Sequence, residues 1–164
     1  MKKKSGFTLI ELMVVITIIG ILAVIVLPNL TSVRGRGQDV AIKEQMTQFR
    51  ATAAMFYDDN YGYTKNAQNS IVGPQDCTDS TSFPTDSVFT TSDFVKVAAG
   101  IKANSAAAPV CYLGKNTSTK SQSWAMIATM RGGGLWCVDS SGSSKSVTST
   151  NVSTLTSGDD VVCP

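Results

Sequence analysis

The sequence contains no histidine, which removes the commonest general base and the commonest metal ligand in proteins. A serine-histidine-aspartate triad is therefore excluded. None of the four cysteines forms a CxxC pair, no GxSxG nucleophile motif occurs, and Gly132–Gly134 is not followed by the Lys-Ser/Thr pair of a phosphate-binding loop. These absences predict a protein that is not an enzyme and that carries no cofactor.

Charge is also sparse, at 16% of residues, with a formal net charge of +2. Three of the basic residues, Lys2–Lys4, lie at the extreme N-terminus, and without them the net charge is −1. The basic residues beyond position 102 are scattered rather than clustered. The sequence therefore gives no sign of a nucleic-acid-binding surface.

One long apolar run follows the lysines and extends from Phe7 to Leu27. As a helix, these residues would be about 31 Å long, which matches the roughly 30 Å of a bilayer's hydrocarbon core. Lysines flanking such a segment remain on the cytoplasmic side. The run predicts a single-pass helix in the cytoplasmic (inner) membrane, with the N-terminus in the cytoplasm and contact with lipid.

The small residue Gly6 precedes this run, whereas a secretory signal has its small-residue cleavage site after the apolar stretch. Cleavage after Gly6 would remove only the cationic leader. The apolar helix would stay on the mature chain, with a free amine on Phe7 and the carboxylate of Glu11 one turn away.

The segment Gly6–Glu11 (GFTLIE), behind a basic leader and before a long apolar run, resembles the prepilin peptidase site of type IV pilins and of type II secretion pseudopilins. The resemblance is dense over residues 2–28 and becomes a likeness of general layout beyond. It implies cleavage between Gly6 and Phe7, N-methylation of Phe7, and assembly into a helical homo-oligomeric filament. It also implies three partners: prepilin peptidase, an inner-membrane assembly platform and its cytoplasmic ATPase. The alternative is a plain membrane anchor or an uncleaved signal.

Glu11 is the only charged side chain in the apolar run, and a lone carboxylate in a bilayer costs about 2.5–3.5 kcal/mol. The nearest complementary charge is the amine that cleavage would expose on Phe7. Pairing within one chain is geometrically unfavourable, so we expect the amine of a neighbouring subunit to meet this acid, as the resemblance also implies. In the unassembled subunit, Glu11 could instead be solvated at the headgroup level.

Gly20 and Pro28 are the weak points of the predicted helix, because glycine is a poor helix former and proline removes a hydrogen bond. In the resembling family, a glycine and a proline so placed bound a stretch that can loosen within the filament. Local melting between these two residues is therefore expected.

Beyond Pro28 the apolar spacing becomes amphipathic, with Ile42, Met46, Phe49, Ala53 and Phe56 on one helical face. We expect a continuous helix from about residue 7 to 57, ended by the turn formers of residues 58–62. The expected organisation is a leader at 1–6, a hydrophobic helix at 7–28, an amphipathic half at 29–58 and a head domain at 59–164.

In the head, residues 63–90 are expected to form a loop, followed by a short helix with Ser92 as its N-cap. A strand is expected at 110–113, then a hairpin of strands 124–130 and 135–138 around residues 131–134. Residues 139–142 read as a turn, and residues 140–157 as mostly irregular with one edge strand near 146–148. The fold class is α+β: a long N-terminal helix packed on a small antiparallel sheet, a layout that again resembles pilins.

The four cysteines lie beyond the apolar run, in a part of the chain expected outside the cytoplasm, where disulfides form. Of the three possible pairings, we expect Cys77–Cys111 and Cys137–Cys163, because each closes a local loop. Each bridge would add about 3–4 kcal/mol on the chain-entropy model. Free buried thiols are the alternative. The resemblance likewise implies a disulfide-closed C-terminal region.

Metal binding has weak support. Asp159 and Asp160 are the better calcium candidates, because some pseudopilins bind calcium near their C-terminal loops, while Asp58 and Asp59 lack the spaced carboxylates of an EF-hand. Turn formation and solvation are the simpler interpretation of all four, and we expect no bound metal.

The sequence therefore predicts a structural pilin, major or minor, in an extracellular or periplasmic filament of the kind used for adhesion and twitching motility. Three alternatives stay open: a type II secretion pseudopilin acting as a piston, a minor tip pilin that binds DNA or surfaces, and a membrane-tethered enzyme. The C-terminal disulfide loop favours the pilus over the secretion piston.

Overall fold

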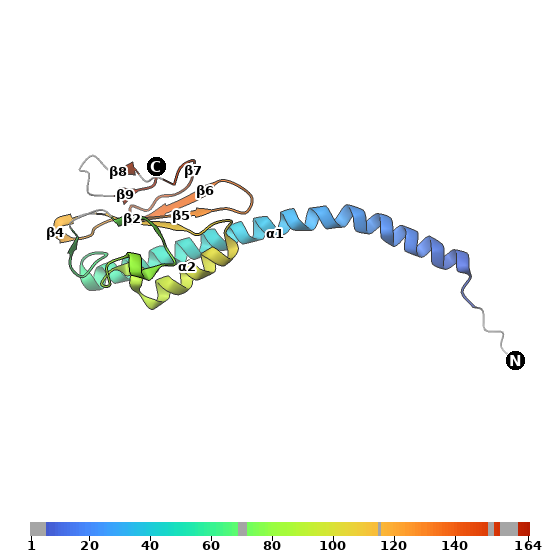
Figure 1. Cartoon of the computed structure of the whole chain (residues 1–164), viewed down its shortest axis with the longest axis horizontal. Coiled ribbons are helices and arrows are strands. Elements are labelled where there is room, and N and C mark those ends of the chain that lie inside the picture. The colour runs from blue at the N-terminus through green and yellow to red at the C-terminus, as the bar shows by residue number, and fades with distance from the viewer. Residues whose placement is uncertain (1–5, 69–71, 115, 151–152, 155–160) are drawn as a thin grey trace. The chain divides into compact units, whose positions relative to one another are not determined.

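The computed structural model describes residues 6–68, 72–114, 116–150, 153–154 and 161–164 (Figure 1); for 27–31, 67–68, 116–119 and 153–154 it describes the backbone alone. The chain divides into two units, residues 1–35 and residues 36–164. Helix α1 (Leu9–Asn60) contributes to both. The continuous helix expected from the sequence is confirmed, with a start two residues later than Phe7.

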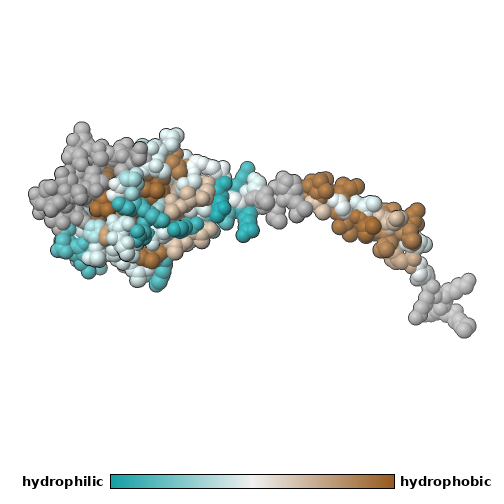
Figure 2. Space-filling model, in the orientation of Figure 1, coloured by the Kyte–Doolittle hydropathy of each residue, from teal (hydrophilic) through white to brown (hydrophobic). Residues whose placement is uncertain are grey.

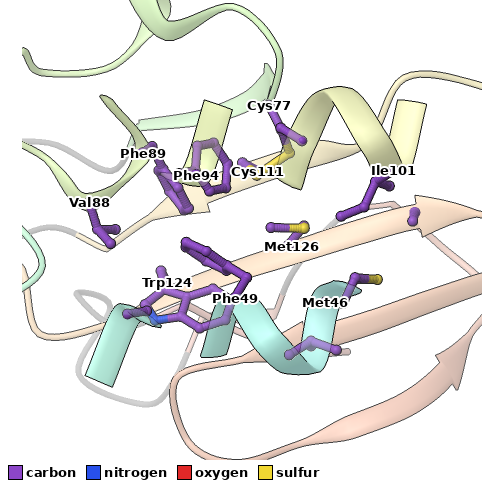
Figure 3. Packing of buried hydrophobic residues seen from close by; sticks show 14 of the residues in the cluster. Met46, Phe49, Cys77, Val88, Phe89, Phe94, Ile101, Cys111, Trp124 and Met126 are labelled. Carbon is purple, nitrogen blue, oxygen red and sulfur yellow. A yellow bond between two sulfur atoms is a disulfide. The ribbon is translucent and has the colours of Figure 1, made fainter. Parts of the chain in front are cut away.

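In the second unit, the apolar stripe of α1 is buried as expected. Ile42, Met46, Phe49 and Ala53 are at most 1% exposed, and Phe56 is half-buried. Phe49 lies at the centre of an aromatic cluster, with ring centroids 4.7 Å from Phe94 and 4.8 Å from Trp124 (Figure 3). Residues of this stripe recur every three or four positions, so one helical face enters the core while the other stays exposed.

The sheet of the second unit is antiparallel, with the order β2-β3-β5-β6-β7. These strands are β2 (Val72–Asp76), β3 (Val110–Leu113), β5 (Trp124–Thr129), β6 (Leu135–Asp139) and β7 (Ser144–Val147). Two further pairs are β1 (Ala67–Gln68) with β4 (Asn116–Lys120), and β8 (Ser153–Thr154) with β9 (Val161–Val162). The α+β class and the expected β5–β6 hairpin are confirmed, and Met130 N–H donates to Gly134 O across its loop at 3.0 Å.

Strand β5 separates two hydrophobic cores. Trp124, Met126 and Ala128 belong to the core that contains the α1 stripe and helix α2 (Ser92–Asn104). Ala125 and Ile127 point to the opposite face, where they pack with Tyr112, Cys137, Val147, Val161 and Cys163. Because both faces are covered, this strand is apolar at nearly every position rather than at alternate ones.

Each core contains one disulfide. Cys77 and Cys111 lie in the first core, near Phe94 and Ile101 (Figure 3), and Cys137 and Cys163 lie in the second. All four cysteines are at most 6% exposed. The pairing expected from loop length is therefore confirmed.

Residues 63–90 are not simply a loop, and this expectation was wrong. They contain β1, β2 and the 3-10 helices η1 (Ser80–Ser82) and η2 (Val88–Thr90). The β2 sequence VGPQD has no apolar alternation, and proline is tolerated because β2 is an edge strand. Gly73 has φ +132°, and a Cβ there would lie 2.7 Å from Cys111 O, so this position requires glycine.

The N-cap of α2 was also misplaced by one residue. Thr91, rather than Ser92, has the extended backbone of a cap, and its Oγ accepts a hydrogen bond from Phe94 N–H at 3.3 Å. Both residues carry a hydroxyl, so composition alone did not distinguish them. The expected edge strand near 146–148 is confirmed as β7, one or two residues earlier.

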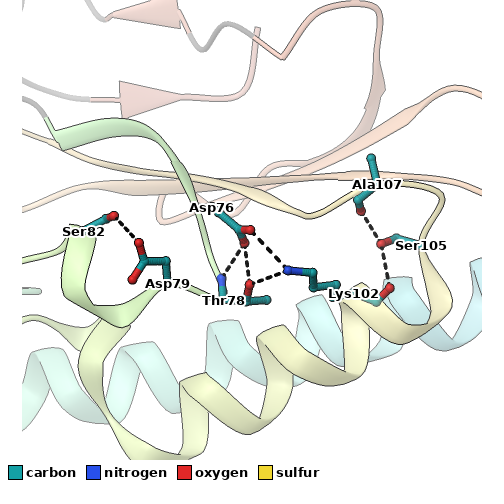
Figure 4. Close-up of polar contacts among 7 residues, drawn as sticks. All are labelled: Asp76, Thr78, Asp79, Ser82, Lys102, Ser105 and Ala107. Carbon is teal, nitrogen blue, oxygen red and sulfur yellow. Dashed lines mark hydrogen bonds and ion pairs between the residues drawn. The ribbon is translucent and has the colours of Figure 1, made fainter.

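Polar contacts tie the end of β2 to the last turn of α2 (Figure 4). Asp76 Oδ1 accepts hydrogen bonds from Thr78 N–H at 2.8 Å and Thr78 Oγ–H at 2.7 Å, and Lys102 Nζ lies 3.4 Å from Asp76 Oδ2. Partial burial acts to raise the pKa of Asp76, but the hydrogen bonds from Thr78 and the charge of Lys102 outweigh it, so the pKa is lowered.

Candidate processing and assembly site

The expected cleavage site lies in an exposed segment that precedes α1. Gly6 and Phe7 lie before the first helical residue, Leu9, and both are exposed, with Phe7 81% exposed. A Cβ built on Gly6 would meet no atom within 4 Å. No described residue therefore packs on Gly6, and the packing of these residues does not require glycine at this position.

Glu11 forms a capping box with Thr8. Glu11 Oε2 accepts hydrogen bonds from Thr8 N–H at 2.9 Å and from Thr8 Oγ–H at 2.7 Å, while Glu11 N–H donates to Thr8 Oγ at 3.3 Å. These bonds satisfy backbone donors that the first turn of a helix otherwise leaves free. Among the described residues, none donates a hydrogen bond to the other carboxylate oxygen, Oε1.

The role of Thr8 was missed from the sequence, although the spacing Thr8-x-x-Glu11 is the standard signature of this motif. Glu11 therefore combines an unusual charge in an apolar run with an ordinary role in starting the helix.

Apolar side chains surround this carboxylate. Phe7, Ile10, Val14 and Val15 line a shallow surface groove together with Glu11. The segment Leu9–Val26 is long and apolar enough to span a membrane and is the one such stretch found among the described residues. Figure 2 shows its hydrophobic side chains on the surface, and none of this segment is buried. Within the first unit, these side chains lack a core of their own.

The two expected weak points, Gly20 and Pro28, both lie within α1, whose helical backbone is continuous through them. A Cβ at Gly20 would meet nothing within 4 Å, so no packing contact with a described residue requires glycine there. Loosening between them in a filament stays a prediction.

The weak metal candidates are not brought together. Asp159 and Asp160 lie outside the described residues, while Asp58 and Asp59 are exposed at the end of α1. Within the part of the chain that the structure describes, no three His, Cys, Asp or Glu side chains are grouped so that they could hold a metal ion.

Asp139 is a buried carboxylate that the sequence indicated only as a turn residue. It is 0% exposed, and its Oδ1 accepts hydrogen bonds from Ser141 N–H at 3.0 Å, Ser141 Oγ–H at 2.7 Å and Ser143 N–H at 3.0 Å. Its Oδ2 accepts from Cys163 N–H at 2.8 Å. Asp139 thus connects the turn after β6 to the C-terminal disulfide. Its position before Ser140-Ser141-Gly142 predicts the turn, but the bond to Cys163 has no local sequence signal.

Comparison with known proteins identifies the class of the N-terminal segment: residues 1–27 match the family described as the prokaryotic N-terminal methylation motif. The chain is 41% identical over 66 residues to the type IV wide pilus major component PilA4 of Thermus thermophilus, covering 40% of this chain and 50% of that protein. It is 37% identical over 67 residues to the type II secretion system core protein G of Pseudomonas aeruginosa, covering 41% and 47%.

A third relative, the type IV major pilin protein PilA of Myxococcus xanthus, is 33% identical over 73 residues, or 44% of this chain and 33% of the relative. The chain thus spans half or less of the length of each of these curated relatives. No solved structure matched the chain. The resemblance to type IV pilins and type II secretion pseudopilins is confirmed, and these relatives are named as pilus and secretion components rather than enzymes.

Proposed function

We propose that this protein is the structural subunit of a type IV pilus-like filament, anchored first in the cytoplasmic membrane, cleaved after Gly6 and polymerised through its N-terminal helix. The observation that carries the proposal is the apolar surface of Leu9–Val26, which is entirely exposed within the chain. Lipid can cover this surface before assembly. Copies of the same helix can cover it afterwards.

Glu11 sets the axial position of one subunit relative to its neighbour in the proposed filament. Thr8 occupies one carboxylate oxygen, so the open Oε1 is available to the amine freed on Phe7 of a neighbouring copy. An apolar surrounding such as that formed by Ile10, Val14 and Val15 strengthens this attraction relative to water. The capping box can remain intact while the intermolecular pair forms, because the two interactions use different oxygens.

Assembly would require machinery outside the chain. Helices gain little from packing together while they remain in lipid, because acyl chains are as apolar as leucine. Extraction of a spanning helix is also costly, so an energy source is needed. Prepilin peptidase, an N-methylating activity, a membrane platform and its cytoplasmic ATPase are the proposed partners. The proposed destination is an extracellular or periplasmic filament, with the N-terminus cytoplasmic before assembly.

A second candidate is a pseudopilin that acts as a secretion piston. The likeness to the core protein G of a type II secretion system favours it. Both candidates require the same processing and the same helix packing, and differ in whether the filament reaches the cell surface. The disulfide between Cys137 and Cys163 is our reason for preferring the pilus.

Electron microscopy of sheared surface material, labelled with antibody to this chain, tests the filament directly. We expect labelled fibres from the wild type and none from a Gly6→Leu variant, which should keep its leader and remain in the membrane. Gly20→Leu is the matched control for processing, because a side chain there meets nothing within 4 Å and the leader should still be removed. Wild-type cells without labelled surface fibres would contradict the pilus. Normal processing of Gly6→Leu would contradict the cleavage site.

A further inference from the structure

We infer that the second unit carries two complementary surfaces at opposite ends of its part of α1, through which one copy binds another along the filament axis. A basic surface formed by Arg36 and Val40 would enter an acidic groove around Met55 and Asp59 of the other copy. The inference rests on the proposed filament function and adds the surfaces of the second unit that meet and their spacing.

The basic surface has an exposed cation that no described residue pairs with. Arg36 is exposed and makes no ion pair with any described residue. Val40, four residues later and therefore on the same helical face, is 64% exposed. An apolar side chain next to an unpaired cation thus faces outward near the start of the unit.

Asp39, the carboxylate nearest to Arg36 in sequence on this helix, is already occupied. Asp39 accepts hydrogen bonds from the backbone N–H groups of Arg131 at 2.6 Å and Gly132 at 2.9 Å, in the loop of the β5–β6 hairpin. Arg36 and Asp39 line a groove of about 290 Å³ with this loop. Asp39 thus serves to attach the hairpin to α1. The charge of Arg36 remains available to another molecule.

The opposite surface has the reverse sign. A groove of about 340 Å³ is lined by Met55 and Phe56 from α1, by Asp59 at the helix end, and by Asp93 from α2, together with Thr52, Val88 and Thr91. Met55 is 69% exposed, and Asp59 makes no ion pair with a described residue. Asp93 has one cation nearby, Lys96 at 3.8 Å, in an exposed pair that contributes little.

The two surfaces are complementary in charge, and each also exposes an apolar side chain. The aliphatic part of an arginine side chain covers apolar surface while its guanidinium binds carboxylates, so Arg36 of one copy can lie over Met55 and reach Asp59 of the other. Val40 supplies the apolar contact beside it. A second copy is the occupant that we favour, because both surfaces lie on one helix and a parallel array therefore repeats the contact at every subunit.

The spacing makes the inference quantitative. Arg36 and Asp59 are 23 residues apart on a continuous helix, or about 34 Å at 1.5 Å per residue. Two parallel copies displaced by this distance along the helix axis bring the basic surface of one beside the acidic groove of the other. A filament built with this contact must contain a neighbouring pair with an axial offset of about 34 Å.

Charge reversal in the full-length protein tests the pairing. Arg36→Glu and Asp59→Lys should each lower the yield of sheared filaments at least fivefold, while leader removal and membrane insertion stay normal. The double variant Arg36→Glu/Asp59→Lys should recover to within about twofold of the wild type. Lys145→Glu, on the exposed edge strand β7, is the matched control and should change nothing. Single variants with normal yield, or a double variant without recovery, would overturn the inference.

A photocrosslinker identifies the occupant. With p-benzoylphenylalanine in place of Val40 in the wild-type background, irradiated filaments should yield a crosslink to the segment containing Met55 and Asp59 of another copy. A crosslink to a different segment, or to a different protein, would overturn the inference. Absence of any wild-type filament would instead contradict the proposed function, so the two failures are distinguishable.

Discussion

The two units of this chain differ in whether their apolar side chains are exposed or buried. Between Leu9 and Val26, every apolar side chain is exposed. In the second unit, apolar side chains from α1, α2 and both faces of the sheet close into two cores, each with its own disulfide. The first unit needs another molecule to cover it, whereas the second has its own core. The difference sets an apolar surface that is open to lipid or to other copies apart from a unit that folds around its own cores.

The carboxylates of Asp139 and Glu11 differ in a similar way, in how many of their oxygens accept hydrogen bonds. All hydrogen bonds to Asp139 come from its own unit, and they use both oxygens. The bonds to Glu11 from described residues use one oxygen, Oε2, and none of them reaches Oε1. The satisfied carboxylate of Asp139 fixes local structure, whereas Glu11 is the carboxylate that we propose to bind the amine of a neighbouring copy.

Phe49→Ala should give the largest effect and should be confined to the second unit. Phe49 is 1% exposed and contacts the rings of Phe89, Phe94 and Trp124, so its removal leaves a cavity. We expect a loss of about 3–5 kcal/mol in the free energy of unfolding. Denaturant unfolding of the full chain in detergent measures it. Met55→Ala, at an exposed position, should change stability by less than about 0.5 kcal/mol.

Asp139→Ala should cost about 3 kcal/mol in the free energy of unfolding, because it leaves the part-buried N–H donors of the turn and the buried N–H of Cys163 without an acceptor. Asp139→Asn keeps one acceptor oxygen and should cost less. Equal stability of Asp139→Ala and the wild type in the same unfolding experiment would show that the C-terminal region does not depend on this carboxylate.

Glu11→Ala should impair filament assembly and leave the folding stability of the second unit unchanged, unlike the two substitutions above. Loss of one charge-assisted pair of about 2 kcal/mol corresponds to roughly a thirtyfold decrease in incorporation into filaments. Quantitative immunoblotting of sheared and membrane fractions measures it, with Glu44→Ala, on the exposed face of the same helix, as the control. An unchanged amount of the Glu11→Ala chain in the sheared filaments would contradict the proposed pairing of Glu11 with a neighbouring subunit.

The smallest expected effect is a dependence of folding stability on pH. The pKa of Asp76 is lowered in the folded state, so its contribution to stability is present above the ordinary aspartate pKa of about 3.9 and is lost as pH falls through the lowered value. The side chain is 39% exposed, so solvent screening keeps this contribution below about 1 kcal/mol. The melting temperature of Asp76→Asn should lie slightly below that of the wild type at pH 6 and converge on it as pH falls through the lowered pKa of Asp76. A constant difference across this range would exclude the linkage.

Local patterns in the sequence predicted the elements that depend on the spacing of apolar residues or on turn-forming residues. The spacing of Ile42, Met46, Phe49 and Ala53 predicted the buried face of α1, and the glycines at 132–134 predicted the β5–β6 hairpin. Loop length predicted both disulfides. In the site, the order of lysines, Gly6, Phe7 and Glu11 predicted the processing segment, which depends on adjacent residues alone.

The features that sequence reasoning missed depend on contacts between distant segments. Strand β2 pairs with β3 across more than thirty residues, and VGPQD has no strand signal of its own. The burial of Asp139 depends on Cys163, and the attachment of the hairpin loop to α1 depends on Asp39. The Thr8–Glu11 capping box is different, because its signal is local and could have been found.

The central claim is that trimming exposes an amine on Phe7, which then pairs with Glu11 of another copy. Intact-mass and N-terminal analysis of this chain, recovered from sheared filaments, tests it most directly. The account predicts a chain that begins at Phe7, carries one added methyl group and retains two disulfides. Filaments built from chains that still begin at Met1 would contradict it.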